Sequence, residues 1–375
     1  MDHVRPDYNN CIVNLSNSVL KAFGAETSAP TLPMADKLLE KEYKNVVVLL
    51  MDAMGISILE KHLEPDGFLR SHLAGSYSSV FPPTTVAATT SMLSGLYPNE
   101  HGWLGWDMYY PELDKNVTVF LNTDQLREDE NGEFKPLVPA ADFHAGFTYT
   151  PYKNIITRIN EAGGKAYASM PFLPPFPKDL EAILTRVEDL CQEPERKFIY
   201  AYWNEPDNTM HEKGPDSNEA HELVIKLEKR LEKFASGLSD TLLLITADHS
   251  QIECDNYCLL DYPEILKCLV RMPSVEPRAL SFWVKDEYKE TFPDIFREAF
   301  GDKFWILTRD EVIENKLFGT GKDHKLFRGM LGDYLAVSVS DCTIFLTHKE
   351  VDMIPGGHAG LTKEEIEIPL IAIER

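Results

Sequence analysis

Metal-binding side chains follow three apolar runs in this 375-residue chain, at residues 46–51, 198–203 and 242–247. Runs of this kind are candidate buried parallel strands, and open α/β sheets bind ligands just beyond the carboxyl ends of such strands. Three aspartates and three histidines placed there predict a metal site, and their number suits two ions rather than one. The six side chains are Asp52, Asp207, His211, Asp248, His249 and, in a Gly-rich segment near the end of the chain, His358.

Most of these side chains also have an ordinary structural interpretation. An aspartate after a buried strand, such as Asp52, often caps the next helix. Asp207 and His211 are four residues apart and share one helix face. A capping aspartate followed by an exposed histidine has the same spacing. A histidine between glycines is typical of a turn as well. Asp248 with its neighbouring histidine is harder to explain in this way, because both would leave a buried strand unpaired. Taken together, the residues favour a metal site, and an Asp–His–His set suits zinc with an open position.

Two threonines stand where a rigid two-proline turn enters a small-residue helix, as Pro82-Pro83-Thr84-Thr85. Backbone N–H groups at a helix N-terminus favour a phosphate group, and a threonine hydroxyl becomes a nucleophile when a metal or a base lowers its pKa. In a two-metal site, one cation binds the nucleophile oxygen and both neutralise phosphoryl oxygens during in-line displacement. Simple N-capping is the alternative interpretation of this pair.

The segments 81–85 and 94–102 resemble the nucleophile segment of the nucleotide pyrophosphatase/phosphodiesterase family, within the alkaline phosphatase superfamily. Residues 205–215 resemble the same family's E-P-D-x-x-x-H-x-x-G-P motif. Asp248-His249 and His358 follow in the family's order, so the resemblance spans about residues 45–373. It implies an α/β fold, namely an alkaline-phosphatase-like three-layer α/β/α sandwich with a mostly parallel central sheet and an inserted cap.

The resemblance also implies a role for each candidate residue. It places the nucleophile on Thr85 rather than Thr84, with a phospho-threonine intermediate that water resolves. It implies two divalent ions, usually zinc, although manganese suits the carboxylate content as well. The first ion would be held by Asp52, Thr85, Asp248 and His249. The second would be held by Asp207, His211 and His358.

One position departs from the family pattern. The family's phosphate-binding asparagine falls on Trp106, whose only donor is its indole N–H. Trp106 and Trp103 are therefore candidate substrate-binding residues that stack on a base or wall off the pocket. The alternative is that both tryptophans belong to the core.

The remaining sequence predicts the elements that hold these residues. Apolar spacing in the first forty residues predicts a helical lead-in, and residues 106–150 are polar and turn-rich, as for an excursion over the active face. The segment 260–335 is predicted to be an inserted cap that shapes substrate access, which leaves 1–259 and 336–375 as the catalytic core. The other predicted elements are strands at 45–51 and 165–169 and helices at 55–63, 151–162 and 217–234.

The amino-acid composition limits which classes of partner are expected. With 37 Lys and Arg against 60 Asp and Glu, the net charge is −23, which argues against a nucleic-acid polymer or an anionic membrane as partner. No apolar run approaches a membrane span and the N-terminus lacks a signal-peptide region, so a cytoplasmic location is expected. Six scattered cysteines show no disulfide framework, and Cys254 and Cys258 lack a second pair to complete a zinc site.

The predicted function is a two-metal phosphohydrolase that cleaves a phosphodiester or pyrophosphate bond in a small-molecule phosphate ester. The alternatives are a phosphomonoesterase or phosphonate hydrolase on the same scaffold, and a non-catalytic metal-binding recognition protein. No arginine lies near Thr85 to form the clamp of alkaline phosphatases proper, and a sulfatase needs cysteine or serine at that position. A dehydrogenase is disfavoured because residues 52–55 do not match a dinucleotide-binding fingerprint. The substrate and the oligomeric state stay open.

Overall fold

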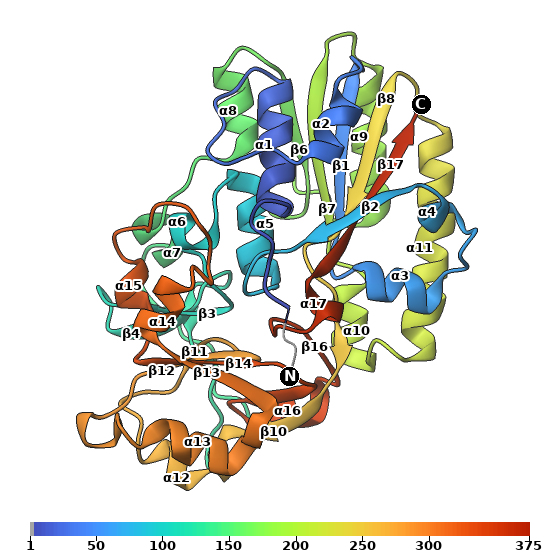
Figure 1. The fold of residues 1–375 in the computed structure, drawn as a ribbon. Helices are drawn as coiled ribbons and strands as arrows, with labels where there is room; N and C mark the ends of the chain where they lie inside the picture. Colours follow the sequence, from blue (N-terminus) through green and yellow to red (C-terminus); the bar gives the residue numbers. More distant parts are fainter. Residues whose placement is uncertain (1–3) are drawn as a thin grey trace.

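A computed structural model describes residues 4–375 (Figure 1). Its main sheet has six strands, in the order β2 (Leu73–Ser78), β17 (Glu367–Glu374), β8 (Thr241–Thr246), β1 (Asn45–Met51), β7 (Lys197–Trp203) and β6 (Ala166–Ser169). β1 pairs in parallel with β7 and β8, and β6 pairs in parallel with β7, whereas β17 runs antiparallel to β8 and β2. All seven residues of β1 are buried, as expected for a central strand covered on both faces.

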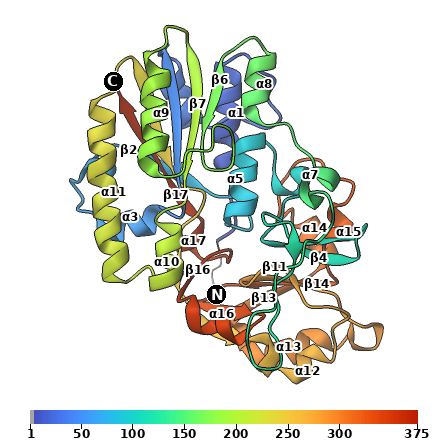
Figure 2. The ribbon, with the colours of Figure 1, turned by 180° about the vertical axis from the view of Figure 1, so that it is seen from behind.

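Helices cover both faces of the main sheet (Figures 1 and 2). On one face lie α1 (Ile12–Ala22), α2 (Pro33–Leu39), α5 (Thr85–Ser94) and α8 (Ile155–Glu161), and on the other lie α9 (Leu180–Gln192) and α11 (Asn218–Ser236). These three layers enclose the largest group of buried apolar side chains. The predicted α/β/α sandwich with a mostly parallel sheet is therefore confirmed. Shorter helices at its margin are α3 (Ile56–His62), α4 (Phe68–Ser71) and α6 (Pro98–His101).

A second sheet, antiparallel throughout, lies beside the first. Its strands are, in order, β13 (Phe304–Thr308), β14 (Tyr334–Ser338), β12 (Ala279–Phe282), β11 (Ser274–Glu276), β3 (Asp107–Tyr110), β4 (Lys115–Thr118) and β5 (Thr123–Asp124). The helices of this part are α7 (Ala145–Tyr149), α12 (Pro263–Leu266), α13 (Phe292–Phe300), α14 (Arg309–Glu314) and α15 (Phe327–Met330). Two further apolar clusters form its core.

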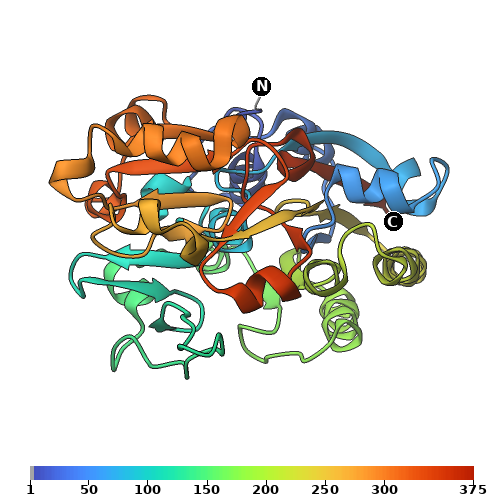
Figure 3. The ribbon, with the colours of Figure 1, turned by 90° about the horizontal axis from the view of Figure 1, so that it is seen from below.

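Short segments from the last third of the chain connect the two sheets. β9 (Ile252–Glu253) pairs with β16 (Gly356–Gly357), and β10 (Asp255–Cys258) pairs with β15 (Cys342–Phe345). Seen from below, these segments and α16 (His348–Met353) run between the second sheet and the green helices (Figure 3). A buried ion pair, Arg278 Nε to Glu365 Oε1 at 2.8 Å, links the second sheet to α17 (Lys363–Ile366).

The helices and strands predicted for the main sheet lie close to their expected positions, whereas the second sheet differs from the expected layout. Its strands come from two stretches of the chain, 107–124 and 274–338. The predicted cap segment 260–335 supplies only some of these strands, and part of the polar excursion at 106–150 supplies the others. The division into residues 1–259, 260–335 and 336–375 stays a prediction. The predicted helix at 151–162 begins later, because Asn154 caps it by accepting a hydrogen bond from Thr157 N.

All six cysteines are free thiols. Within residues 4–375, no helix is both long enough and apolar enough to cross a lipid bilayer.

Candidate active site

The six candidate ligands meet at one end of the main sheet. Asp52 follows β1, and Asp248 with His249 follows β8. Asp207 opens α10 (Asp207–Lys213), which follows β7 and also carries His211. His358 follows β16, whose pairing with β9 brings the loop of residues 356–360 beside the segment after β8. The carboxyl ends of three parallel strands and one distant loop therefore build the site.

One group of ligands surrounds the candidate nucleophile. His249 Nε2 lies 3.4 Å from Asp52 Oδ1 and 3.6 Å from Asp248 Oδ2. Thr85 Oγ1 lies 3.3 Å from His249 Nε2 and 3.5 Å from Asp52 Oδ2. The three ligand atoms of Asp52, Asp248 and His249 lie within 4.8 Å of one another, as a shared cation requires.

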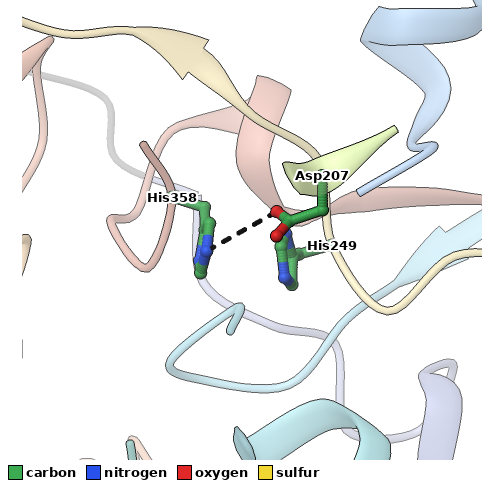
Figure 4. A group of neighbouring side chains, drawn as sticks. All are labelled: Asp207, His249 and His358. Carbon is green, nitrogen blue, oxygen red and sulfur yellow. Dashed lines mark ion pairs between the residues drawn. The ribbon is translucent and has the colours of Figure 1, made fainter. Parts of the chain in front are cut away.

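A second group adjoins the first, and Figure 4 shows two of its members, Asp207 and His358, beside His249 of the first group. His211 Nε2 lies 3.4 Å from Asp207 Oδ1 and 3.2 Å from His358 Nε2, and His358 Nε2 lies 3.9 Å from Asp207 Oδ1. The rings of His249 and His358 stack with centroids 3.8 Å apart. Asp207, His249 and His358 also offer ligand atoms within 4.8 Å of one another. His249 therefore lies between the two groups and could bind an ion on either side.

The histidine rings are oriented for metal binding. In each of the three, Nδ1 faces a backbone carbonyl oxygen, which can only accept a hydrogen bond. Nδ1 therefore carries the proton and Nε2 presents a lone pair to the site, an arrangement usual for metal-binding histidines. The pairs are His211 with Gly356 O at 2.8 Å, His249 with Ser250 O at 3.1 Å and His358 with Pro83 O at 3.1 Å.

The carboxylates fit a divalent cation for an independent reason. Asp52 Oδ1 and Asp248 Oδ2 are buried, and neither accepts a hydrogen bond from any residue of the described chain. Burial raises the pKa of Asp52 well above its usual value, and the charges of Asp248 and Asp207 raise it further. Burial, with His249 and His211 nearby, lowers the pKa of His358. Buried oxygens of this kind are costly unless a charge partner compensates them, and a bound cation would do so.

Further residues hold the ligands in place. Tyr202 donates a hydrogen bond to Asp52 Oδ2, and Gln251 Nε2 donates to the backbone oxygen of Asp207 at 3.1 Å. Ala53 and Ala359, each directly after a ligand, have φ angles of 58° and 90°, a region that non-glycine residues seldom occupy. Tyr202 and Gln251 were not predicted from the sequence as site residues. The only local signals in the sequence are that Gln251 lies close to the predicted ligand His249 and that Tyr202 carries a hydroxyl within an apolar strand.

The threonine pair divides into two different environments. Thr85 is the first residue of α5, so its hydroxyl lies beside the ligand groups and its backbone N–H belongs to the open first turn. Thr84 occupies the N-cap position but makes no capping hydrogen bond. Its hydroxyl instead donates to Glu276 Oε1 at 2.7 Å. N-capping by the Thr84 side chain, the alternative interpretation of the pair, is thus absent.

The two candidate tryptophans also differ. Trp103 is only 1% exposed and donates its indole N–H to Thr150 O at 2.8 Å, so it lies in the core. Trp106 is 41% exposed, and its ring packs edge-on against Phe120 with centroids 6.2 Å apart. The backbone N–H of Trp106 donates to Glu276 Oε1 at 2.8 Å. Of the two tryptophans, only Trp106 is exposed enough to contact a ligand that enters from solvent.

Replacing Glu276 with glutamine is expected to stabilise the protein increasingly as the pH rises. Burial raises the pKa of Glu276 to about 8, whereas an unfolded chain loses this proton near pH 4.5. The folded state therefore binds one more proton between these values, and its stability falls as the pH increases, by at most about 1.4 kcal/mol per unit. Urea unfolding at pH 5.5 and 8 should show a larger gain for Glu276→Gln at pH 8. An equal gain at both values, as expected for the exposed control Glu298→Gln, would contradict this assignment.

Comparison with known proteins places the chain among phosphoesterases. The family described as type I phosphodiesterase/nucleotide pyrophosphatase matches residues 46–273. Human ectonucleotide pyrophosphatase/phosphodiesterase family member 1 is 26% identical over 197 residues, which are 48% of this chain and 20% of the relative. Venom phosphodiesterase 2 of Crotalus adamanteus is 25% identical over 191 residues, 47% of this chain and 23% of the relative. The match thus covers about a fifth of the length of these relatives.

Solved structures share the fold over most of the chain. Murine ectonucleotide pyrophosphatase/phosphodiesterase 5, an inactive variant in complex with AMP, has a TM-score of 0.65 and 16% identity, covering 89% of this chain and 88% of its own. Phosphonoacetate hydrolase from Sinorhizobium meliloti, in complex with phosphonoformate, has a TM-score of 0.60 and 14% identity, covering 88% and 89%. At these identities the likeness establishes the fold and leaves function to the site itself.

Proposed function

Since the chain belongs to the type I phosphodiesterase/nucleotide pyrophosphatase family, we propose that it is a two-metal phosphohydrolase that uses Thr85 as its nucleophile. The bond cleaved is a phosphodiester or a pyrophosphate. One observation carries the proposal: the Thr85 hydroxyl lies at the start of a helix and beside a group of buried carboxylate and histidine ligands. A binding module has no need of such a hydroxyl, which argues against a non-catalytic recognition protein.

The ligand groups divide between two divalent ions, zinc or manganese. The first ion would be held by Asp52, Asp248, His249 and the Thr85 oxygen. The second would be held by Asp207, His211 and His358. Without them, the neighbouring carboxylates disfavour ionisation of the threonine hydroxyl, because like charges repel. When bound, the ions supply the positive charge that lowers the hydroxyl pKa and neutralises the phosphoryl oxygens.

The chain itself orients the reaction. The Thr85 hydroxyl gives its proton to solvent and its oxygen attacks phosphorus. An oxygen–phosphorus bond forms, and the bond to the leaving-group oxygen breaks, so that this oxygen departs with the electron pair and takes a proton from solvent. The phospho-threonine formed on Thr85 is then hydrolysed by water, which returns the hydroxyl and releases the second product. Backbone N–H groups in the first turn of α5 face the same place and favour the phosphoryl oxygens by hydrogen bonding and the helix dipole.

The second sheet contacts the residue before the nucleophile. Glu276 on β11 contacts Thr84, and Trp106 precedes β3. We propose that this sheet, which contains strands of the predicted cap segment 260–335, selects the leaving group. Trp106 offers an exposed aromatic face for that purpose, where the family pattern has an asparagine.

Replacing Trp106 with alanine is expected to raise KM for bis-p-nitrophenyl phosphate by roughly three- to tenfold with a smaller change in kcat, because one aromatic contact is lost. Steady-state kinetics with the metal-loaded protein measure both constants. Val270→Ala, which removes another exposed apolar side chain, is the control. An unchanged KM would show that Trp106 does not contact this substrate.

A phosphomonoesterase or phosphonate hydrolase is the second candidate. Trp106 favours this second candidate. The resemblance implies a phosphate-binding asparagine at this position for diester cleavage, and tryptophan lacks the amide group of asparagine. The phosphonoacetate hydrolase fold shows that such chemistry occurs on this scaffold.

Hydrolysis assays separate the candidates. Chelated protein is supplied with zinc or manganese and given bis-p-nitrophenyl phosphate, p-nitrophenyl phosphate or phosphonoacetate. Faster diester cleavage supports the proposed function, and faster cleavage of either other compound supports the second candidate. Bound metal without turnover of any of the three would count against both and favour a recognition protein.

A further inference from the structure

A buried glutamate outside both ligand groups contacts the residue before the nucleophile and the backbone of Trp106. Glu276, at the end of β11, is 8% exposed. Its Oε1 accepts hydrogen bonds from Thr84 Oγ1 at 2.7 Å and from Trp106 N at 2.8 Å. Thr84 immediately precedes the nucleophile, and Trp106 stands where the family pattern places a phosphate-binding residue. A single oxygen thus connects three distant segments of the chain.

The contact with Thr84 changes what the start of α5 can bind. A threonine at the N-cap ordinarily accepts a hydrogen bond from a first-turn N–H group. In α5 the Thr84 hydroxyl donates to Glu276, and its oxygen accepts no capping hydrogen bond from the first turn. The first-turn N–H groups next to Thr85 consequently keep their hydrogen-bonding capacity for an anionic group from outside.

The contact with Trp106 fixes the backbone that leads into β3. A side chain at Gly105 would meet Val275 O at 2.7 Å, so the backbone before Trp106 lies directly against β11. β11 then pairs with β3, where Val275 lies opposite Asp107. Trp106 is therefore held through its backbone, which leaves its ring exposed.

We propose that Glu276 is a positioning residue that anchors Thr84 at the start of α5, next to the nucleophile, and holds the backbone of Trp106, where the family pattern has a phosphate-binding residue. This inference rests on the proposed phosphohydrolase function. Glu276 touches neither the candidate ligands nor Thr85 in the hydrogen bonds of the structure, so its effect on the reaction is transmitted through Thr84 and Trp106.

The test compares three variants of the zinc-loaded protein. Glu276→Ala removes the acceptor, Glu276→Gln keeps an acceptor oxygen, and Thr84→Val removes the donor without changing the side-chain volume much. We expect Glu276→Ala and Thr84→Val each to lower kcat for bis-p-nitrophenyl phosphate by roughly tenfold. Glu276→Gln should recover most of that loss. The double variant Glu276→Ala/Thr84→Val should be little worse than Glu276→Ala alone, because Thr84→Val removes a contact that Glu276→Ala has already broken.

A measurement independent of activity accompanies the kinetics. Hydrogen–deuterium exchange should rise in Glu276→Ala at the peptides containing residues 85–88 and 105–107, and stay near the wild-type level in Glu276→Gln. Thr84→Val keeps the proposal testable if Glu276→Ala does not fold. An unchanged kcat and unchanged exchange in Thr84→Val and Glu276→Ala would overturn it. Equal losses in the glutamine and alanine variants, or increased exchange throughout the second sheet, would show that Glu276 is merely structural.

The two proposals fail in different ways. If the zinc-loaded wild-type protein cleaves none of the phosphoesters, the proposed function is wrong and kinetics cannot report on Glu276. Hydrogen–deuterium exchange at residues 85–88 and 105–107 is then the one readout that tests the role of Glu276. If wild-type turnover is present and neither readout responds to loss of the contact, only the role of Glu276 is wrong.

Discussion

Replacing Thr85 with valine is expected to lower turnover of bis-p-nitrophenyl phosphate by about a thousandfold or more while the chain keeps its bound metal. Valine preserves the volume of threonine but removes the hydroxyl, which lies 3.3 Å from His249 Nε2 and 3.5 Å from Asp52 Oδ2. Six other ligand side chains remain in place, so metal content should fall little. Turnover and metal content are measured on the same preparations.

Serine at position 85 separates loss of the nucleophile from local disturbance. Thr85→Ser keeps a hydroxyl at the start of α5, so it should retain far more activity than Thr85→Val. Peptide mapping after acid quenching during turnover should find phosphate on residue 85 in the wild type. Thr157→Val, on the exposed side of α8, is the matched control and should behave as the wild type. Near-normal hydrolysis by Thr85→Val would show that another group attacks phosphorus.

Removing one ligand from either group should reduce metal content from two ions per chain toward one. Asp52→Asn removes a carboxylate charge from the group around Thr85, and His211→Ala removes an imidazole from the adjoining group. Turnover should fall by roughly a hundredfold or more in each variant, because either ion alone leaves part of the phosphoryl charge uncompensated. Elemental analysis of the purified proteins counts the ions, and assays with added zinc test rescue.

His348→Ala provides the control for these variants. The His348 side chain pairs with Glu128 and Asp261 and is about half exposed, and it belongs to neither ligand group. It should bind the same number of ions as the wild type. Two ions retained in both Asp52→Asn and His211→Ala would contradict the assignment of separate groups.

The main sheet and its ligand positions were predictable because their signals are local. A buried parallel strand is a continuous apolar run, and β1 begins and ends where its run does. Asp52 and Asp248 come within two residues of such runs and Asp207 comes four residues after one, so the geometry of parallel strands brings them to one end of the sheet. His358 was predicted from its place in a Gly-rich segment and from its order in a family pattern. In the structure, the β9–β16 pair delivers it to the site.

The second sheet was not predictable in the same way, because its strands are short and pair across long sequence separations. β11 contains three residues and lies between β12 and β3, which are separated by more than a hundred and fifty positions along the chain. Nothing in residues 106–150 alone shows that they join residues 274–338. The cap predicted from one continuous segment therefore does not include strands β3–β5, which belong to the same sheet.

The supporting contacts within the site escaped prediction for a related reason. Glu276, Tyr202 and Gln251 contribute through partners that lie far away in the sequence. Trp103 and Trp106 are three positions apart and of one residue type, yet one lies in the core and the other is exposed. Burial decides between them, and it depends on how the whole second sheet packs.

The central claim is that two bound divalent ions and Thr85 together cleave phosphoesters. Its most direct test titrates zinc or manganese into chelated protein and measures metal content and bis-p-nitrophenyl phosphate turnover on the same samples. Turnover should be absent without metal, rise with metal content and reach its plateau near two ions per chain. Turnover that survives chelation, or its absence in protein that holds two ions, would contradict the claim.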